Sequence, residues 1–480
     1  MYATRCTRVG RALLLAGLMG LVGQPLAFAL DPNRGVTQYL HTIWDATTGL
    51  SPRDAYALGQ TPDGYLWLGT VDGLVRFDGV RFTVFDKTNT PAMQQNYVKA
   101  LHVDRHGVLW IATFGGGLVS YERGRFTAYT SHDGLAGDAV LAVGDTRDGS
   151  LWVGTTAGLS RFKDGTFTTY RRADGLASDT VRSIHEDRQG TLWIGTTAGL
   201  SRRAEGGRFE SFPTLGVDGP QRDGAVYAIA ETSDGSLWFG VYGVGLDRFS
   251  AGSHTLYTTA NGLSSNAINA IEPDRHGNVW VATGGGGIDR FTNGRIDAYT
   301  KLEGLSSNIA LSLLEDHEGS LWIGAAGGGL ERLADGKVLG YSTREGLAAE
   351  RVWSVQEARD GAMWVASDGG VNELRDGRFT IRNDPAWSGS GIVRSVVVAR
   401  NGGVWLGTYA NGLSLFSGGR FTHLTMADGL SHNSVWALCE DARGTLWIGT
   451  ENGLDQYVDG RLVNPQSNPR LLHESVHAIS

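Results

Sequence analysis

Short apolar segments, each centred on a tryptophan, recur along the chain at a nearly constant spacing of 41 to 45 residues. In every copy Leu, Val or Met precedes the tryptophan, and Gly or Ala stands two residues after it. The repeated residues are Trp67, Trp110, Trp152, Trp193, Trp238, Trp280, Trp322, Trp364, Trp405 and Trp447. A period of about 42 residues is typical of β-propellers, in which one repeat forms one blade.

Each repeat predicts four short antiparallel strands. The first three are typified by residues 181–184, 192–196 and 199–202, and the fourth by residues 378–380. Asp-Gly or Asn-Gly dipeptides recur between the third and fourth strands, and two-residue hairpins favour them because both positions need positive φ. These dipeptides stand at 164–165, 293–294, 335–336, 376–377 and 459–460. The predicted fold is therefore an all-β propeller of four-stranded blades, with the tryptophans packed between neighbouring blades.

Ten repeats exceed the four to eight blades of an ordinary ring. We predict one seven-bladed β-propeller over residues 30–335, followed at 336–480 by the first three blades of a second, truncated propeller. Residues 37–42 resemble a fourth strand and are expected to complete the last blade of the first ring. Residues 475–480 match the first strand of an eleventh repeat, which indicates the front part of a longer protein.

Residues 1–29 have the features of a secretory signal peptide. Arg5, Arg8 and Arg11 precede an apolar run at 12–22, and Ala27-Phe28-Ala29 provides a small-x-small cleavage site. An uncleaved membrane anchor is the alternative, although the run is shorter than the roughly 20 residues that a spanning helix needs. The predicted location is the periplasm.

Composition narrows the choice of partner. The chain has 70 glycines but only 11 prolines, which suits frequent tight turns, and its net charge is −8. An acidic chain without a cluster of Lys and Arg argues against nucleic acid as a partner. Cys6 lies in the predicted signal peptide and Cys439 stands alone, so no disulfide framework and no metal site is expected. No cofactor is expected either, because the glycine runs join strands rather than opening a helix.

The motif Asp-x-x-Gly-x-Leu-Trp-Ile-Gly-Thr, at 187–196 and 441–450, resembles the two-component regulator propeller repeat. The resemblance covers nearly all of residues 36–480. It implies the extracytoplasmic sensor of a bacterial two-component receptor, often one for carbohydrates. It also implies downstream membrane and output domains in the same polypeptide, the output being a histidine kinase or a diguanylate cyclase. No such enzyme chemistry falls on a residue of this sequence.

Candidate ligand-binding residues come from one variable position and one loop. Ten residues before each tryptophan stands Ala or Ser, as expected near a crowded axis, and the residue before it is large and varies. Its aromatic and polar members are Tyr56, Lys99, Arg182, Tyr227, Asn269, Trp353, Arg394 and Trp436. The loop between the second and third strands, expected on the same face, adds Phe114, Tyr242 and Tyr409. Aromatic platforms beside cations suit a small polar ligand such as a sugar or an acidic glycan. The alternative is that these side chains fill the channel or pack between blades.

The other polar residues are predicted to have structural roles. Aspartates recur six or four residues before the tryptophans and are expected to cap turns. Two rival functions stay open: a secreted propeller enzyme (a lyase or hydrolase) and a protein-binding scaffold. His102, His185 and His276 are expected on the face opposite the candidate residues, which weakens the enzyme hypothesis. A homodimer would suit a signalling receptor.

Overall fold

The computed structural model of the chain describes residues 30–50, 54–204, 206–212, 224–292, 294–336, 340–385, 387, 391–463 and 474–479. The predicted signal peptide lies outside these residues. The described chain folds into ten four-stranded antiparallel sheets, which confirms the predicted all-β class. None of its helices is long and apolar enough to span a membrane. The helices are single 3-10 turns: η1 (Val36–Gln38), η2 (Ala46–Thr48), η3 (Ser131–Asp133), η4 (Arg172–Asp174), η5 (Thr259–Asn261), η6 (Thr343–Glu345) and η7 (Met426–Asp428).

Seven of the sheets lie between residues 30 and 336, and six of them run in chain order from the innermost to the outermost strand. Sheets one to three consist of β2 (Ala57–Gln60), β3 (Leu66–Gly69), β4 (Leu74–Phe77) and β5 (Phe82–Phe85); β6 (Val98–Val103), β7 (Leu109–Thr113), β8 (Gly117–Glu122) and β9 (Arg125–Tyr129); and β10 (Val140–Asp145), β11 (Leu151–Thr155), β12 (Leu159–Lys163) and β13 (Thr166–Tyr170). Sheets four to six consist of β14 (Val181–Glu186), β15 (Leu192–Thr196), β16 (Gly199–Arg203) and β17 (Phe209–Phe212); β18 (Val226–Glu231), β19 (Leu237–Val241), β20 (Gly245–Ser250) and β21 (Ser253–Tyr257); and β22 (Ile268–Pro273), β23 (Val279–Thr283), β24 (Ile288–Thr292) and β25 (Arg295–Tyr299).

The seventh sheet joins the two ends of this region. Strands β26 (Ala310–Glu315), β27 (Leu321–Ala325) and β28 (Gly329–Ala334) are completed by β1 (Leu40–Trp44), which pairs antiparallel with β28. The N-terminal strand therefore closes the ring, as the sequence predicted. It starts at Leu40 rather than at residue 37, because the preceding residues Val36–Gln38 form the η1 turn.

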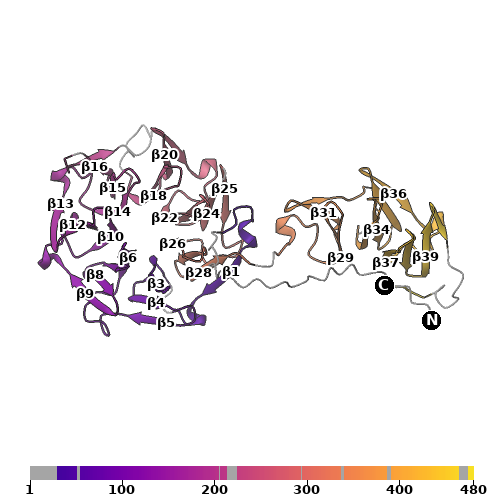
Figure 1. Ribbon diagram of the computed structural model, residues 1–480, viewed down its shortest axis with the longest axis horizontal. Helices are drawn as coiled ribbons and strands as arrows, with labels where there is room; N and C mark the ends of the chain where they lie inside the picture. Colours follow the sequence, from indigo (N-terminus) through magenta and orange to yellow (C-terminus); the bar gives the residue numbers. More distant parts are fainter. Residues whose placement is uncertain are drawn as a thin grey trace, which may run out of the picture. The chain divides into compact units, whose positions relative to one another are not determined.

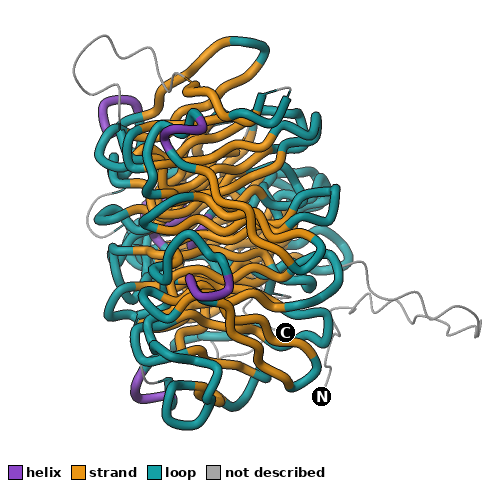
Figure 2. Tube along the Cα trace, turned by 90° about the vertical axis from the view of Figure 1, so that its left-hand side faces the viewer, coloured by secondary structure: helices purple, strands orange, loops and turns teal. Residues whose placement is uncertain are grey.

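The seven sheets form a closed ring. The innermost strands β2, β6, β10, β14, β18, β22 and β26 contact one another in this order, and β26 returns to β2. Figure 1 shows the sheets arranged around one axis, with β5, β9 and β13 on the outside. Seen from the side in Figure 2, strands fill the middle of the ring and loops form its two faces. Loop residues on those faces are the ones available to a ligand.

The repeated tryptophans lie between the sheets, where Trp67 and Trp280 are fully buried. The small residue two positions after each tryptophan is also explained by this packing. A Cβ atom on Gly154 would lie 2.6 Å from Cγ1 of Val181, on the innermost strand of the next sheet. The Asp-Gly hairpins adopt the expected conformation, with φ of 51° at Asp164 and 79° at Gly165.

Residues 340–479 form a separate compact unit with three sheets. These sheets consist of β29 (Val352–Glu357), β30 (Met363–Ser367), β31 (Gly370–Arg375) and β32 (Arg378–Ile381); β33 (Val393–Val398), β34 (Val404–Thr408), β35 (Leu413–Ser417) and β36 (Arg420–Leu424); and β37 (Val435–Glu440), β38 (Leu446–Thr450), β39 (Gly453–Val458) and β40 (Arg461–Val463).

The C-terminal segment partly follows the predicted eleventh repeat. Val476 N–H donates to the Thr450 carbonyl at 2.9 Å, as Val98 N–H does to the Thr70 carbonyl at 2.8 Å in the ring. Residues 474–479 nevertheless form no strand, since a strand needs a partner beyond this one bond. At the other side of the unit, Val352 and Val355 of the innermost strand β29 are 41% and 52% exposed.

Candidate ligand-binding site at the mouth of the ring

Each sheet of the ring has two ends, which we call the mouth end and the turn end. The mouth end holds the start of the innermost strand and the loop between the second and third strands. The turn end holds the turn between the first and second strands. The structure places the candidate residues of the ring at the mouth end, where loop residue Phe114 pairs with Ala139 just before the next innermost strand.

A β-bulge marks the variable position in nine of the ten sheets. Val98 pairs with Thr113 and Ala100 with Ala112, so that Lys99 is the extra residue. In the same way the bulge falls at Leu141, Arg182, Tyr227, Asn269, Leu311, Trp353, Arg394 and Trp436. In the first sheet, Tyr56 immediately precedes β2. A bulge re-aims the side chain that it carries, and here it frees one side chain per sheet from the strand pairing.

Four residues form a group that we call the lysine cluster: Tyr56, Tyr97, Lys99 and Phe114. The Tyr97 ring lies 5.2 Å from the Tyr56 ring and 5.9 Å from the Phe114 ring. Lys99 Nζ donates to Tyr97 Oη at 3.1 Å and lies 4.6 Å from the centroid of Tyr56. Sequence reasoning missed Tyr97, although it stands two residues before Lys99, a spacing that places side chains on one side of a strand.

Three further candidates form a second group, the arginine cluster: Arg182, Tyr227 and Tyr242. The guanidinium carbon of Arg182 lies 4.7 Å from the centroid of Tyr227. The rings of Tyr227 and Tyr242 stack at 4.8 Å with an interplanar angle of 20°. Arg182 Nε is buried without a hydrogen-bond partner among the described residues. A predicted loop residue and two predicted strand residues thus form one contact group.

The charges at the mouth end are not balanced by acids. Neither Lys99 nor Arg182 forms an ion pair with a described residue. Burial, and then the nearby charge of Arg182, lower the pKa of Lys99. Burial and the neighbouring Tyr97 raise the pKa of Tyr56 to about 12. Asp54, the carboxylate beside Tyr56, accepts from that tyrosine at 3.5 Å and from Gly327 N–H at 2.5 Å.

Not every candidate in the ring is available to a ligand. Asn269 Nδ2 donates to the Ala310 carbonyl at 2.7 Å, so this side chain links two neighbouring sheets. Phe114 and Tyr242 remain 46% and 48% exposed. The accessible part of the mouth end is therefore aromatic, with Lys99 and Arg182 beside it.

In the unit of residues 340–479, four candidates form a comparable stack. The guanidinium carbon of Arg394 lies 3.8 Å from the centroid of Trp353, 4.7 Å from Trp436 and 5.2 Å from Tyr409. The two indoles donate to carboxylates: Trp353 to Asp368 at 2.6 Å, and Trp436 to Glu451 at 2.5 Å. Because acids surround this stack, it is less cationic than the clusters of the ring.

Trp387, an aromatic residue outside the repeated motif, packs within its own unit. Its indole N–H donates to Ser414 Oγ at 3.2 Å, and its ring lies 5.4 Å from Phe421. It therefore covers the edge of the sheet that ends in β36.

The recurring aspartates at the turn end cap turns, as predicted, and they also hold the tryptophans. Asp187 Oδ1 accepts from the N–H groups of Gln189 and Thr191, and its other oxygen accepts from Trp193 Nε1 at 2.8 Å. Where a threonine takes this place, as at Thr146, its hydroxyl accepts from the indole and donates to Asp148 at 2.7 Å. Both kinds of aspartate therefore have a structural role.

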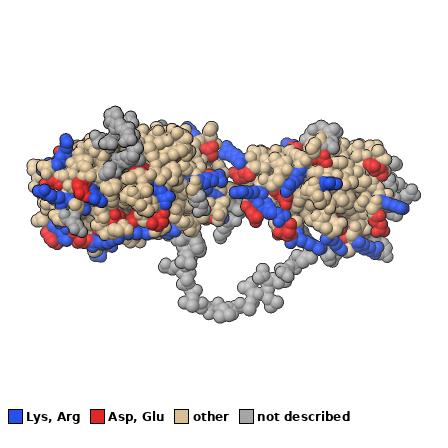
Figure 3. Space-filling view, turned by 90° about the horizontal axis from the view of Figure 1, so that it is seen from above, with Lys and Arg blue, Asp and Glu red and all other residues tan. Residues whose placement is uncertain are grey.

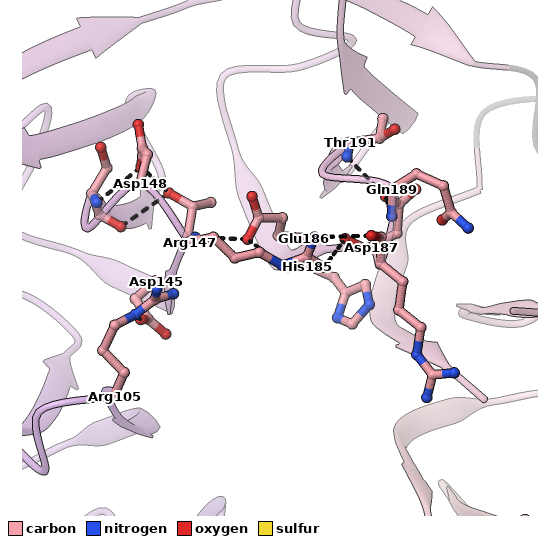
Figure 4. Close-up of polar contacts among 12 residues, drawn as sticks. Arg105, Asp145, Arg147, Asp148, His185, Glu186, Asp187, Gln189 and Thr191 are labelled. Atoms are coloured by element: carbon pink, nitrogen blue, oxygen red, sulfur yellow. Dashed lines mark hydrogen bonds and ion pairs between the residues drawn. The ribbon is translucent and has the colours of Figure 1, made fainter. Parts of the chain in front are cut away.

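Neighbouring sheets are joined at the turn end by a repeated polar clasp (Figure 4). Arg147 N–H donates to Glu186 at 2.8 Å, and its guanidinium donates to the Asp187 carbonyl at 2.6 Å. The clasp also closes the ring, because His317 N–H donates to Gln60 Oε1 at 2.7 Å.

Two of the three histidines have hydrogen-bond contacts at this end, and His185 Nε2 lies 3.9 Å from Glu231. His102 Nε2 lies 2.8 Å from Asp145, which Arg105 contacts at 2.7 Å, and His276 Nδ1 lies 3.1 Å from the Leu30 carbonyl. Burial alone would raise the pKa of Asp145, but its bonds to His102 and Arg105 lower it to about 2. The described residues contain no group of three or more His, Cys, Asp or Glu arranged to hold a metal ion.

Comparison with known families identifies the repeat. The family model described as "Two component regulator propeller" matches residues 92–115, 175–198, 220–243, 262–285, 304–327 and 429–452. The chain carries two component regulator propeller repeats. Each matched segment of this repeat spans the innermost strand and the tryptophan strand of one sheet, so it includes the bulge position and the turn end together. No curated protein matches the sequence at a significant level.

Solved structures show the same fold around these repeats. The extracellular domain of the hybrid two component system BT3049 from B. thetaiotaomicron is 24% identical, with a TM-score of 0.72 over 91% of this chain. The chain spans 62% of the length of that domain. The corresponding domain of BT4673 is 17% identical over 89% of this chain and 67% of its own length, with a TM-score of 0.52. A virginiamycin B lyase from Staphylococcus aureus, 17% identical, has a TM-score of 0.51 over 62% of this chain and 99% of its own.

Proposed function

We propose that this chain is the extracytoplasmic ligand-sensing module of a bacterial two-component receptor. Its two component regulator propeller repeats and its fold likeness to extracellular domains of hybrid two component systems support this role. The module would work in the periplasm and pass ligand occupancy to membrane and output domains of the same polypeptide, in a receptor that forms a homodimer.

The ligand-binding surface in this proposal is the mouth end of the seven-sheet ring. The observation that carries it is the contrast between the bulge residues and the rest of each repeat. The bulge position changes from sheet to sheet and gathers aromatic and cationic side chains, whereas the turn end repeats the same bonds. Aromatic faces beside cationic groups bind small polar ligands such as glycans by stacking and charge-assisted hydrogen bonds.

Binding of oligosaccharides to the full chain tests this function. A panel of neutral and acidic oligosaccharides would be screened by thermal shift and then measured by isothermal titration calorimetry. We expect at least one sugar to bind, and Tyr227→Ala to weaken that binding tenfold or more, because the stacked Tyr227–Tyr242 pair is lost. The matched control is Tyr65→Ala. It removes a similar Arg–Tyr contact (Arg76 over Tyr65 at 4.5 Å) two residues before Trp67, away from the mouth end.

Three outcomes would contradict the proposal. If no sugar of the panel binds, or if Tyr65→Ala weakens binding as much as Tyr227→Ala does, the mouth end is not the sensor surface. If the chain cleaves a sugar of the panel instead of only binding it, the enzyme hypothesis replaces the sensor.

A further inference from the structure

We propose that a cavity at the turn end, between the third and fourth sheets of the ring, binds a free α-amino acid. Arg203 would hold its carboxylate and Glu186 its ammonium group. This site goes beyond the proposed function, because it lies at the end of the sheets opposite the mouth. The inference follows from a residue that departs from the repeat, the cavity beside it, and the charges that line that cavity.

Arg203 stands at a position that is apolar in the other nine sheets. It follows the residue that pairs with Trp193, just as Phe162 follows the residue that pairs with Trp152. The equivalent residues are Phe77, Tyr121, Phe162, Phe249, Phe291, Leu333, Leu374, Phe416 and Tyr457. The Phe162 ring lies 6.4 Å from Trp110 of the preceding sheet, and the guanidinium carbon of Arg203 lies 5.3 Å from the centroid of Trp152 in the same way. A charged residue in place of a repeated core residue is a departure of the kind found at functional sites.

A cavity of about 530 Å³ lies beside this arginine. The matching groove between the second and third sheets, where Phe162 stands, has about 150 Å³, and the one in the unit of residues 340–479, with Phe416, has about 360 Å³. The hairpin after Arg203 adds to the space because its lining residues Ala204 and Gly207 are small. A Cβ atom on Gly207 would lie 3.2 Å from Arg203 Nη2, so this glycine leaves room for the guanidinium. The volume lies within the range of small-molecule sites, about 300–1,000 Å³.

Arg203 lacks the acidic partner that neighbouring arginines have. Arg161 contacts Asp148 at 2.7 Å, and Arg202 contacts Glu210 at 2.5 Å. Among the described residues, Arg203 has no such partner, and its Nε is buried without a hydrogen-bond acceptor. Contact with the indole face offsets part of this cost. A carboxylate would offset more of it, because its two oxygens can accept from Nε and a terminal nitrogen together.

The acids that line the cavity indicate that the ligand also carries a positive group. Asp148 is already neutralised by Arg161. Glu186 differs, since its Oε2 accepts from Arg147 N–H at 2.8 Å while its Oε1 accepts from no described residue. Figure 4 shows Asp148 and Glu186 at the turn end. An ammonium group in the cavity would therefore find its partner in Glu186 Oε1.

This pair of charges distinguishes a zwitterion from other charged ligands. Sulfate or phosphate would pair with Arg203 but would also face the negative charge of Glu186, and a simple amine would leave Arg203 unpaired. An α-amino acid carries both charges on neighbouring atoms. Thr146, Gln189 and Thr191 line the same cavity and can form hydrogen bonds with a polar, uncharged side chain.

The surrounding surface does not select the charge of the ligand. Lys and Arg are interspersed with Asp and Glu over the visible surface of the ring (Figure 3). A large field of one sign would attract ligands of the opposite sign, whereas a mixed surface leaves the choice to the groups inside the cavity. A ligand without net charge is consistent with such a surface.

Binding of free amino acids to the full chain tests the inference. The common L-amino acids would be screened by thermal shift, and the strongest stabiliser would be titrated by isothermal titration calorimetry. Its carboxamide, which lacks the negative charge, and its N-acetyl derivative, which lacks the positive charge, are the matched probes. We expect an amino acid to bind, and both derivatives to bind at least ten times more weakly.

Variants then assign the binding to the two residues. Arg203→Met removes the charge and keeps an apolar stem, and Glu186→Gln keeps an oxygen for Arg147 N–H. Each should weaken amino-acid binding tenfold or more. The matched control is Arg202→Met, which changes the neighbouring residue on the opposite face of the strand, where it contacts Glu210. Its affinity should stay within a factor of two of the natural chain.

Arg203→Phe separates a ligand-binding role from a structural one. It restores the residue that the third sheet has at Phe162, so it should fold and should lose amino-acid binding. Without amino acid, its melting temperature should exceed that of the natural chain, because an aromatic ring packs on Trp152 without an unpaired charge.

Several outcomes would overturn the inference. It fails if no amino acid binds, or if the carboxamide or the N-acetyl derivative binds as tightly as the free amino acid. It also fails if Arg203→Met, shown by circular dichroism to be folded, keeps full affinity, or if Arg202→Met loses as much. If Arg203→Phe is less stable than the natural chain, Arg203 belongs to the structural framework and the argument for a ligand is wrong. Sugar binding at the mouth end is measured separately, so the proposed function stands or fails independently.

Discussion

The two ends of the innermost strands use charge in opposite ways. At the turn end of the ring, Asp187 accepts three hydrogen bonds, and Arg147 connects the third sheet to the fourth. At the mouth end, Lys99 and Arg182 have no acidic partner among the described residues. On the proposed function, the repeat separates stability from recognition along a strand of six residues, because bonds that recur in each sheet hold the ring while the bulge position is free to change.

Energetics explain why the separation is useful. A buried polar group with all its hydrogen bonds made contributes modestly to stability, whereas one without a partner costs about 1–3 kcal/mol. The turn end avoids this cost by using carboxylates that face several N–H groups. The mouth end carries part of this cost, because Arg182 Nε is buried without a hydrogen-bond partner among the described residues. Functional sites commonly carry such a cost.

The largest expected loss of unfolding free energy comes from replacing one of the buried tryptophans. Trp280 is fully buried, and its indole donates to Asp274 at 2.9 Å. Trp280→Ala should lower the free energy of unfolding by about 3–5 kcal/mol, through the cavity that it leaves. Urea unfolding followed by circular dichroism measures this change. Tyr242→Ala at the mouth end is the control, expected to cost less than about 1 kcal/mol; equal losses would remove the distinction between the two ends.

A smaller loss is expected from the turn-end carboxylates. Asp187→Ala would leave two backbone N–H groups and the indole N–H of Trp193 without their acceptor. The expected loss of unfolding free energy is about 2–3 kcal/mol. Asp187→Asn keeps one oxygen and should lose roughly half as much in the same urea experiment. A loss below about 0.5 kcal/mol for the alanine variant would mean that water replaces these bonds.

Glu272 is an exception among the carboxylates of the turn end, because its burial raises its pKa. It lies on β22. Burial, together with the nearby charges of Glu315 and Asp274, raises its pKa to about 7, although the hydrogen bond from Glu315 N–H opposes the shift. The folded state therefore holds this proton more tightly than the unfolded chain, whose glutamate pKa is about 4.3. The resulting destabilisation is absent below about pH 4, grows as the pH rises, and is complete above about pH 7.

The measurement is the unfolding free energy of Glu272→Gln across pH. The variant should be more stable than the natural chain by about 1–2 kcal/mol at pH 8 and equal to it at pH 4. Glutamine keeps an oxygen to accept from Glu315 N–H. The exposed Glu122→Gln is the control and should show no such trend. A constant difference at all pH values would assign the effect to packing rather than to the proton.

The sequence predicted much of this arrangement because the repeat is visible in it. The tryptophan period, the Asp-Gly hairpins and the outer strand from the N-terminus each have a local signature. The bulges at positions such as Lys99 have none, since they arise from how one strand pairs with the next. The clasp made by Arg147 is equally hidden, because its partners lie about 40 residues away and arginine is common on surfaces.

The smallest expected effect is the change in unfolding free energy when Lys99 at the mouth end is replaced. Its folded pKa is lowered by burial and by Arg182, so the unfolded chain binds this proton more tightly. The natural chain should therefore gain stability as the pH rises toward the ordinary lysine pKa of about 10.4. Lys99→Met should be more stable by roughly 0.5 kcal/mol at pH 7, with the gain lost near pH 10.5.

Lys163→Met is the matched control, because Lys163 contacts Asp148 at 3.4 Å and its removal should not stabilise the chain at any pH. Urea unfolding at pH 7 and pH 10.5 measures both variants. If Lys99→Met also weakens the binding of the sugar found in the oligosaccharide screen, a single substitution stabilises the ring and removes recognition. That pair of results is expected of a residue kept for its ligand. A loss of stability at pH 7 would instead make Lys99 part of the structural framework, and the mouth end would then follow the same rule as the turn end.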